Sequence, residues 1–145
     1  MPNISINETE MKKVLVLGAF DGIHEGHLNL FKQAKKYGDY LVAVVGRDEV
    51  IKKVKGRYPE KNEKERFSDI EKQDMVNEAK LGDLANPYKI INEIKPDVIC
   101  LGYDQNSFTK NLRKEIKKIG IKIEIHRLKS YKPNKYHSSI FKKHA

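Results

Sequence analysis

Three short, almost uninterrupted apolar runs dominate the pattern of this sequence: Val14–Leu17, Tyr40–Val45 and Val98–Leu101. A strand with one solvated face alternates apolar and polar residues, whereas a parallel strand covered by helices on both faces is apolar throughout. Amphipathic segments separate the runs, and a strand, a helix and the next parallel strand form a right-handed crossover. The sequence therefore predicts an α/β fold, a Rossmann-like open, mostly parallel five-stranded sheet with helices on both faces.

The other elements of this pattern are shorter or more polar. Asn62 and Glu65 are spaced as a capping box at a helix start, and Ile121–Ile125 alternates apolar and polar residues as an edge strand does. Residues 55–62, which contain glycine and proline, indicate a basic loop. We therefore expect further strands at 79–81 and 121–125, and helices at 27–37, 62–77, 87–94, 111–119 and 138–143.

The length of 145 residues suits a single domain over 1–145, with a polar leader at 1–11 and a basic tail at 129–145 that closes the functional site. The leader lacks the cationic and apolar regions of a signal peptide, and no apolar run is long enough to span a bilayer. We therefore expect a cytoplasmic protein that does not act in a membrane. The single cysteine, Cys100, lies inside an apolar run and is expected to be a buried thiol.

An excess of basic residues limits the kinds of partner. The formal net charge is +9, from 29 lysines and arginines against 20 aspartates and glutamates. This charge favours an anionic partner, and an ordinary lysine-rich solvated surface explains it equally well. A basic nucleic-acid-binding module is a remote alternative, because the recognised motifs are absent and Tyr131 and Tyr136 are too few aromatic residues for a stacking platform.

A glycine-punctuated turn with two histidines follows the first apolar run directly. Gly18, Gly22 and Gly26 suit a backbone that turns tightly and approaches a ligand closely. His24 and His27 flank the start of the next helix, where two imidazoles can donate hydrogen bonds to one anion and the helix dipole adds positive potential. The usual glycine-rich fingerprints for phosphate are not matched. The turn therefore predicts a phosphate site built on histidines.

The segment Gly18–His27, which reads GAFDGIHEGH, closely resembles the phosphate-binding signature of the nucleotidyltransferase superfamily that includes cytidylyltransferases and adenylyltransferases. The key element is His-x-Gly-His. The resemblance extends through Gly46–Asp48, Lys55–Arg57, Arg66 and Leu101–Gln105. Within the superfamily, the Gly-x-Asp-Gln segment, the Lys-Gly-Arg segment and the tail Tyr136–Ser139 are most similar to archaeal FAD synthase. Glycerol-3-phosphate cytidylyltransferase is the next most similar.

This resemblance implies an enzyme that transfers a nucleoside monophosphate from a nucleoside triphosphate to a phosphorylated acceptor and releases pyrophosphate. The FAD synthase branch implies ATP and FMN as substrates and FAD as product. The alternative is glycerol-3-phosphate cytidylyltransferase, which makes CDP-glycerol from CTP. The resemblance also implies small-molecule partners and no nucleic acid, Mg²⁺ that arrives with the nucleotide without metal ligands from the protein, and a homodimer.

The family motifs also imply roles for individual residues. His24 and His27 would hold α- and β-phosphate oxygens, and Lys55 would reach the attacking and α-phosphates from a flexible loop. These three residues are the expected catalytic residues. The expected nucleotide-binding residues are Gly18, Ala19, Phe20, Asp21, Gly26, Arg57, Gly102, Asp104, Gln105, Ser138 and Ser139.

Several of these positions have a second interpretation. Asp21 either positions the substrate or its metal, or caps the turn. The ring of Phe20 is expected to pack, and Arg66 either assists the phosphates beside Arg57 or is solvated on a surface helix. Ser138 and Ser139 either approach the triphosphate or form a helix N-cap.

Two positions depart from the family pattern. Ala19 stands where many relatives carry threonine or serine, which removes one hydroxyl contact to phosphate. In the tail, His137 replaces a usual serine, and Lys132 and Lys135 stand near the place of an arginine-containing loop typical of the glycerol-3-phosphate enzymes. These departures weaken the cytidylyltransferase assignment most.

Overall fold

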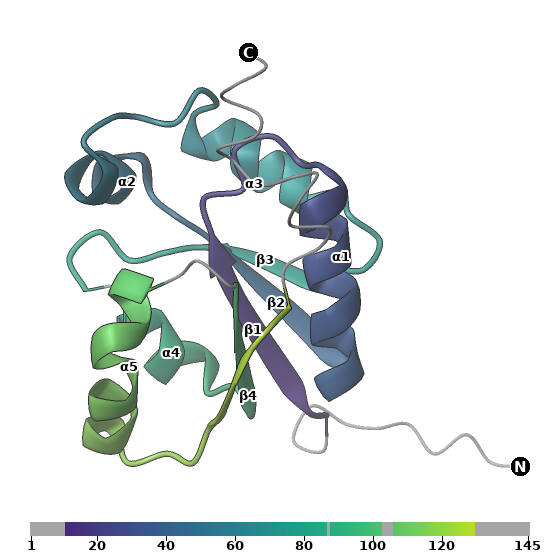
Figure 1. The fold of residues 1–145 in the computed structure, drawn as a ribbon, viewed down its shortest axis with the longest axis vertical. Coiled ribbons are helices and arrows are strands. Elements are labelled where there is room, and N and C mark those ends of the chain that lie inside the picture. Colours follow the sequence, from purple (N-terminus) through teal and green to yellow (C-terminus); the bar gives the residue numbers. More distant parts are fainter. Residues whose placement is uncertain (1–10, 87, 103–105, 130–145) are drawn as a thin grey trace, which may run out of the picture.

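The computed structural model describes residues 11–86, 88–102 and 106–129. Its strands are β1 (Lys13–Gly18), β2 (Tyr40–Val45), β3 (Glu78–Leu81), β4 (Val98–Leu101) and β5 (Glu124–Arg127). They form one five-stranded sheet in the order β3-β2-β1-β4-β5, and all neighbouring strands are parallel (Figure 1). The helices are α1 (Glu25–Ala34), α2 (Asp48–Lys55), α3 (Glu63–Glu71), α4 (Lys89–Ile94) and α5 (Asn106–Ile119), with a 3₁₀ turn at Lys35–Tyr37. The predicted fold class is confirmed.

Helices cover both faces of this sheet, and alternate strand residues face opposite layers (Figure 1). Val14 and Val16 of β1 pack in a cluster with Phe31 of α1, which also contains a residue of α3. Leu15 packs in the second cluster with Ile91 of α4, which also contains residues of α5. All five named side chains are fully buried. This double coverage explains why the central strands are apolar at every position.

The two most apolar predicted strands have the predicted bounds. Tyr40–Val45 forms β2 and Val98–Leu101 forms β4, and these two strands lie on either side of β1. Every residue of β4 and all but the first residue of β2 are buried. Because both faces of these strands are covered, the apolar run begins and ends where the strand does.

Helix α2 lies where no helix or strand was predicted from the sequence. Asp48–Lys55 contains mostly charged residues, and only Ile51 of this helix is buried. Its first turn is fixed by a distant group, because the backbone N–H of Asp48 donates to the Glu63 carboxylate over 2.9 Å. A cap supplied from 15 residues away leaves no local signal in the sequence. Lys55 is consequently the last residue of a helix, and its predicted place in a flexible loop is wrong.

The bounds of β5 and α3 also differ from those predicted, because contacts with other elements determine where they begin or end. β5 spans Glu124–Arg127 instead of 121–125, because its ladder with β4 begins where β4 begins, at the pair Val98 and Glu124. Ile121 and Ile123 precede the strand and pack against the second core cluster. α3 ends at Glu71 instead of residue 77. Asn77 is instead engaged with β2, since its backbone N–H donates to the Leu41 carbonyl.

Within the described ranges, no helix combines the length and the apolar character needed to cross a bilayer. The predicted helix at 138–143 falls outside those ranges.

Candidate active site

The sheet order places a crevice at the carboxyl end of β1. The chain leaves β1 toward β2 and β3 on one side, and β4 and β5 lie on the other side. In an open parallel sheet, ligands bind where the strand order reverses, outside the carboxyl ends of the strands. The turn after β1 and Gly102 after β4 therefore lie at the expected binding position, as the sequence pattern predicts.

His24 and His27 cap the first turn of α1 reciprocally. His24 is the N-cap, and its Nδ1 accepts a hydrogen bond from the Gly26 backbone N–H over 3.0 Å. His27 Nδ1 in turn accepts from the His24 backbone N–H over 3.2 Å. This is the geometry of a capping box, which is usually formed by a serine or threonine and a glutamate. The two ring centroids are 4.0 Å apart, so both imidazoles stand at the same helix N-terminus.

These caps determine which ring nitrogen carries the proton. A ring nitrogen that accepts a hydrogen bond has no hydrogen, so each neutral imidazole carries its N–H on Nε2. Two N–H donors and the positive end of the helix dipole are thereby brought together at the start of α1. The arrangement suits an anion with several oxygen atoms, such as a polyphosphate.

Gly26 and Phe20 make room for the histidines and support them. A Cβ atom on Gly26 would lie 2.7 Å from His24 Cε1, so only glycine lets that ring fold back over the helix start. Phe20 has the left-handed φ of 54°, uncommon for a bulky residue. Its ring is 3% exposed and packs edge-on against His27 and beside Phe31. Phe20 therefore has a packing role, and its ring supports the His27 imidazole.

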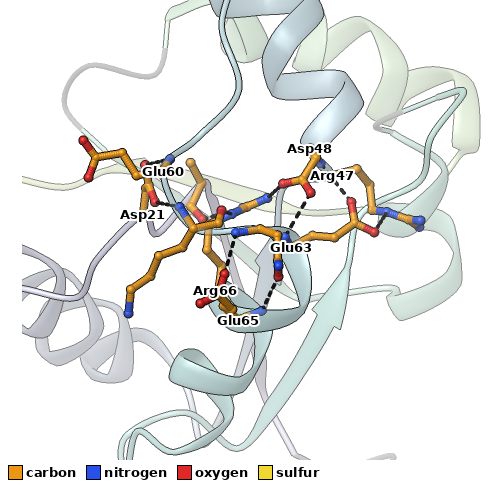
Figure 2. Close-up of polar contacts among 10 residues, drawn as sticks. Asp21, Arg47, Asp48, Glu60, Glu63, Glu65 and Arg66 are labelled. Atoms are coloured by element: carbon orange, nitrogen blue, oxygen red, sulfur yellow. Dashed lines mark hydrogen bonds and ion pairs between the residues drawn. The ribbon is translucent and has the colours of Figure 1, made fainter.

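The N-termini of α2 and α3, by contrast, are already occupied by carboxylates. The Asp48 backbone N–H donates to Glu63 Oε1 over 2.9 Å, and the Glu63 backbone N–H donates to Asp48 Oδ2 over 3.1 Å (Figure 2). Arg47 also pairs with Glu63 over 3.1 Å. Each helix thus neutralises the positive end of the other. Of these three helices, α1 alone is capped by two imidazole side chains, whose ring N–H groups are hydrogen-bond donors.

The predicted ligand-binding carboxylate Asp21 caps a second segment of chain. Its two oxygens accept the backbone N–H groups of Glu60 and Lys61, over 2.8 and 2.9 Å (Figure 2). Of the two interpretations offered by the sequence, the capping role is the one that the structure displays. Its partners lie 39 and 40 residues further along the chain, so the contact ties the turn after β1 to the segment before α3.

Arg66 is a buried structural residue, which neither interpretation of the sequence anticipated. Its guanidinium has no exposed surface and donates to three acceptors: the Ala19 carbonyl over 2.8 Å, the Lys61 carbonyl over 2.9 Å and Asp48 Oδ1 over 2.6 Å (Figure 2). The pair with Asp48 compensates its charge. Each of its three nitrogens donates to a protein acceptor and its side chain has no exposed surface, so it is not placed to bind a phosphate.

Lys55 and Arg57 meet the turn after β1 at a cavity of about 350 Å³. Its lining includes Ala19, Asp21, Lys55, Arg57 and Tyr58. Both cationic side chains are exposed, and Gly56 between them has a left-handed φ of 83° that ends α2. The structure therefore brings two expected phosphate-binding cations together with the turn that leads to the histidines.

Of the remaining predicted site residues, two make hydrogen bonds at strand ends, and four lie outside the described residues. The Gly18 carbonyl accepts the Gly46 N–H over 2.8 Å, which joins the ends of β1 and β2. The Gly102 carbonyl accepts from the Arg127 guanidinium over 3.0 Å. The predicted residues Asp104, Gln105, Ser138 and Ser139, together with the departure at His137, lie outside the described residues. The structural roles of three further residues were not predicted, because their hydrogen-bond partners lie far along the chain. These residues are Asp48, Glu63 and Arg127.

No group of three or more histidine, cysteine, aspartate or glutamate side chains within the described ranges could hold a metal ion. Asp21, the one carboxylate in the turn after β1, has each oxygen engaged by a backbone amide.

Cys100 lies in the core of β4 and has no exposed surface. Burial raises the pKa of its thiol to about 12. We expect no reaction with a thiol reagent at pH 8 in the folded protein and complete reaction in denaturant, measured by mass spectrometry. Because the unfolded thiol ionises at lower pH than the folded one, its contribution to stability is lost as the pH rises toward 12. Rapid labelling of the native protein would contradict this assignment.

The parallel α/β sheet and the histidine-capped helix at its switch point fit a nucleotide-binding protein of the nucleotidyltransferase class. The family model described as Cytidylyltransferase-like matches residues 15–144. The chain belongs to this family, and it is a nucleotidyltransferase enzyme.

Two similar proteins are named FAD synthase. One, from Ferroglobus placidus, is 46% identical over 121 residues, which cover 83% of this chain and 78% of that protein. The other, from Aciduliprofundum boonei, is 40% identical over 121 residues, with 83% and 80% covered. The relationship predicted from the motifs is therefore confirmed.

Solved structures show the same fold. A structure described as the lipopolysaccharide core biosynthesis protein from Thermoplasma volcanium has a TM-score of 0.78 and 39% identity, covering 83% of this chain and 98% of that chain. Pantoate-beta-alanine ligase from Francisella tularensis has a TM-score of 0.58 and 14% identity, covering 86% of this chain and 60% of that chain. The second likeness concerns the fold alone.

Proposed function

We propose that this chain is an FAD synthase, which transfers AMP from ATP to FMN and releases pyrophosphate. The observation that carries the chemistry is the reciprocal capping of α1 by His24 and His27, which presents two N–H donors at a helix N-terminus. The two relatives named FAD synthase support the identity of both substrates.

In the proposed reaction, an oxygen of the FMN phosphate attacks the α-phosphorus of ATP. The bond between that phosphorus and the oxygen bridging to the β-phosphate breaks, and pyrophosphate leaves with the bonding electrons. Negative charge grows on the phosphate oxygens and on the leaving group. The Nε2–H groups of His24 and His27 donate to these oxygens and stabilise the transition state more than the bound substrate.

Lys55 and Arg57 supply the positive charge in this proposal. Both are exposed and line the cavity that includes Ala19 and Asp21, so they can approach a triphosphate held at the start of α1. Mg²⁺ bound to the phosphates would neutralise further charge on the triphosphate. No nucleophilic side chain of the protein is required, because the acceptor phosphate is itself the nucleophile.

The substrates are tested by product identification. The protein is incubated with ATP, FMN and Mg²⁺, and in parallel with CTP, glycerol 3-phosphate and Mg²⁺, and the products are identified by mass spectrometry. We expect FAD and pyrophosphate in the first reaction and no CDP-glycerol in the second. A rise in thermal midpoint with ATP that exceeds the rise with CTP would give the same answer for the nucleotide alone. CDP-glycerol without FAD would overturn the assignment.

The homodimer and the cytoplasmic location stay predictions. Light scattering of the purified protein measures the first, and cell fractionation measures the second.

A further inference from the structure

Two segments that carry the proposed phosphate-binding groups are joined by one exposed carboxylate. Asp21 lies in the turn that leads into His24, and its oxygens accept the N–H groups of Glu60 and Lys61 (Figure 2). Lys55 and Arg57 lie just before those two residues in the chain. We call these two hydrogen bonds the Asp21 latch. Both latch hydrogen bonds are exposed to solvent.

A second, buried link lies beneath the latch. The Arg66 guanidinium donates to the Ala19 carbonyl in the histidine turn and to the Lys61 carbonyl in the other segment. This link is inaccessible to water, whereas Asp21 and Glu60 are exposed. Hydrogen bonds on the surface compete with water and contribute little net stability. The latch can therefore open while Arg66 keeps the base of both segments in place.

The Lys61 side chain takes no part in the latch. The Lys61 side chain turns away to Asp69, with an Nζ to Oδ2 distance of 2.7 Å. The hydrogen bond and the charge of Asp69 raise the pKa of Lys61. Only the backbone of Lys61 thus faces Asp21, and Lys55 and Arg57 remain as the cavity's cationic side chains.

We propose that Asp21 is a positioning residue. It holds the segment of Lys55 and Arg57 against the histidine turn, so that these two cations and the two histidines bind the same polyphosphate. The inference rests on the proposed function. In it, Asp21 touches neither the nucleotide nor its metal. An acceptor-only carboxylate beside a triphosphate would repel it, and here both of its oxygens are engaged by amides instead.

The test is a double-mutant cycle between Asp21 and Lys55. Asp21→Asn keeps the shape of the side chain and removes one of the two acceptors. It is expected to lower kcat about tenfold to a hundredfold, because Lys55 is displaced from the reacting phosphates, with a smaller change in KM for ATP. The same substitution in a Lys55→Ala background is expected to have little further effect, since the group it positions is gone.

The matched control is Glu60→Gln. It removes one negative charge on the other side of the latch, in the 55–61 segment, and leaves both latch hydrogen bonds intact, because Glu60 contributes only its backbone N–H to them. Glu60 also lines the cavity, so this variant shows what the loss of a negative charge there does by itself, and we expect a much smaller change in kcat than in Asp21→Asn. Fold-changes that multiply in the Asp21→Asn, Lys55→Ala double variant, or a shift in the Mg²⁺ dependence of Asp21→Asn, would overturn the proposal in favour of direct contact with substrate or metal.

A second readout does not depend on FAD synthesis. Lys55 and Arg57 are trypsin sites, and native-state cleavage reports how often this segment opens. Cleavage after Arg57 should be several times faster in Asp21→Asn than in the parent protein and unchanged in Glu60→Gln. Equal cleavage rates in all three proteins would show that the latch does not keep the 55–61 segment closed. If the parent protein makes no FAD, the proposed function fails, and this measurement still decides whether the latch exists.

Discussion

Replacing His27 with alanine is expected to lower kcat by about 100- to 1,000-fold, because one donor to the developing charge is lost. The same change also removes the side chain that accepts the His24 backbone N–H, so α1 loses half of its capping box. We expect that loss to lower the free energy of unfolding by about 1 kcal/mol. Steady-state assay of FAD formation and urea denaturation measure the two effects separately.

His27→Gln separates catalysis from folding. Glutamine at the third helical position can accept the N-cap N–H as the histidine does, so the stability of the parent protein should be largely restored. Its amide cannot place an N–H donor where the imidazole Nε2 lies, so the low kcat should persist. Near-normal turnover by His27→Ala would remove the histidine from the proposed mechanism.

The largest expected effect on stability comes from Arg66. Replacing it with methionine leaves the Asp48 carboxylate without its cation and the carbonyls of Ala19 and Lys61 without their donor. Breaking a buried ion pair on one side costs about 3 to 5 kcal/mol, and we expect the lower value because Asp48 is 24% exposed. Urea denaturation of the purified variant measures this loss.

Two further variants test that explanation. Arg66→Lys keeps the charge but lacks the planar fork that reaches three acceptors, so it should recover only part of the stability. Adding Asp48→Asn to Arg66→Met removes the unpaired charge and should also recover part of the loss, because the carboxylate is the most costly group left behind. A loss below about 1 kcal/mol in Arg66→Met would mean that the guanidinium network is not important for folding.

The sequence predicted best those elements whose neighbours cover them completely. β2 and β4 have the predicted bounds, since every stretch of these strands lies between two helix layers. The helix after the histidines was placed two residues late, because it begins at Glu25 with His24 as its N-cap. A histidine is an unusual N-cap residue, and its capping function was not apparent from propensity alone.

Groups whose partners lie far along the chain were the ones that could not be predicted. Arg66 stands among charged residues of α3 and resembles a solvated surface residue. It is buried because the distant Ala19 carbonyl and Asp48 carboxylate, together with the nearby Lys61 carbonyl, accept its hydrogen bonds. The start of α2 depends in the same way on Glu63. The sequence placed the two histidines at the start of a helix, where the structure has them, but their mutual capping could be seen only in the three-dimensional structure.

The reciprocal histidine cap is formed almost entirely within one turn of chain. Its hydrogen bonds join His24, Gly26 and His27 alone, and the supporting ring of Phe20 stands only four residues before His24. If the proposed function holds, so local a motif can be transplanted: we expect the decapeptide Gly18–His27, placed over an apolar surface at a strand-to-helix junction of a designed parallel scaffold, to bind polyphosphate.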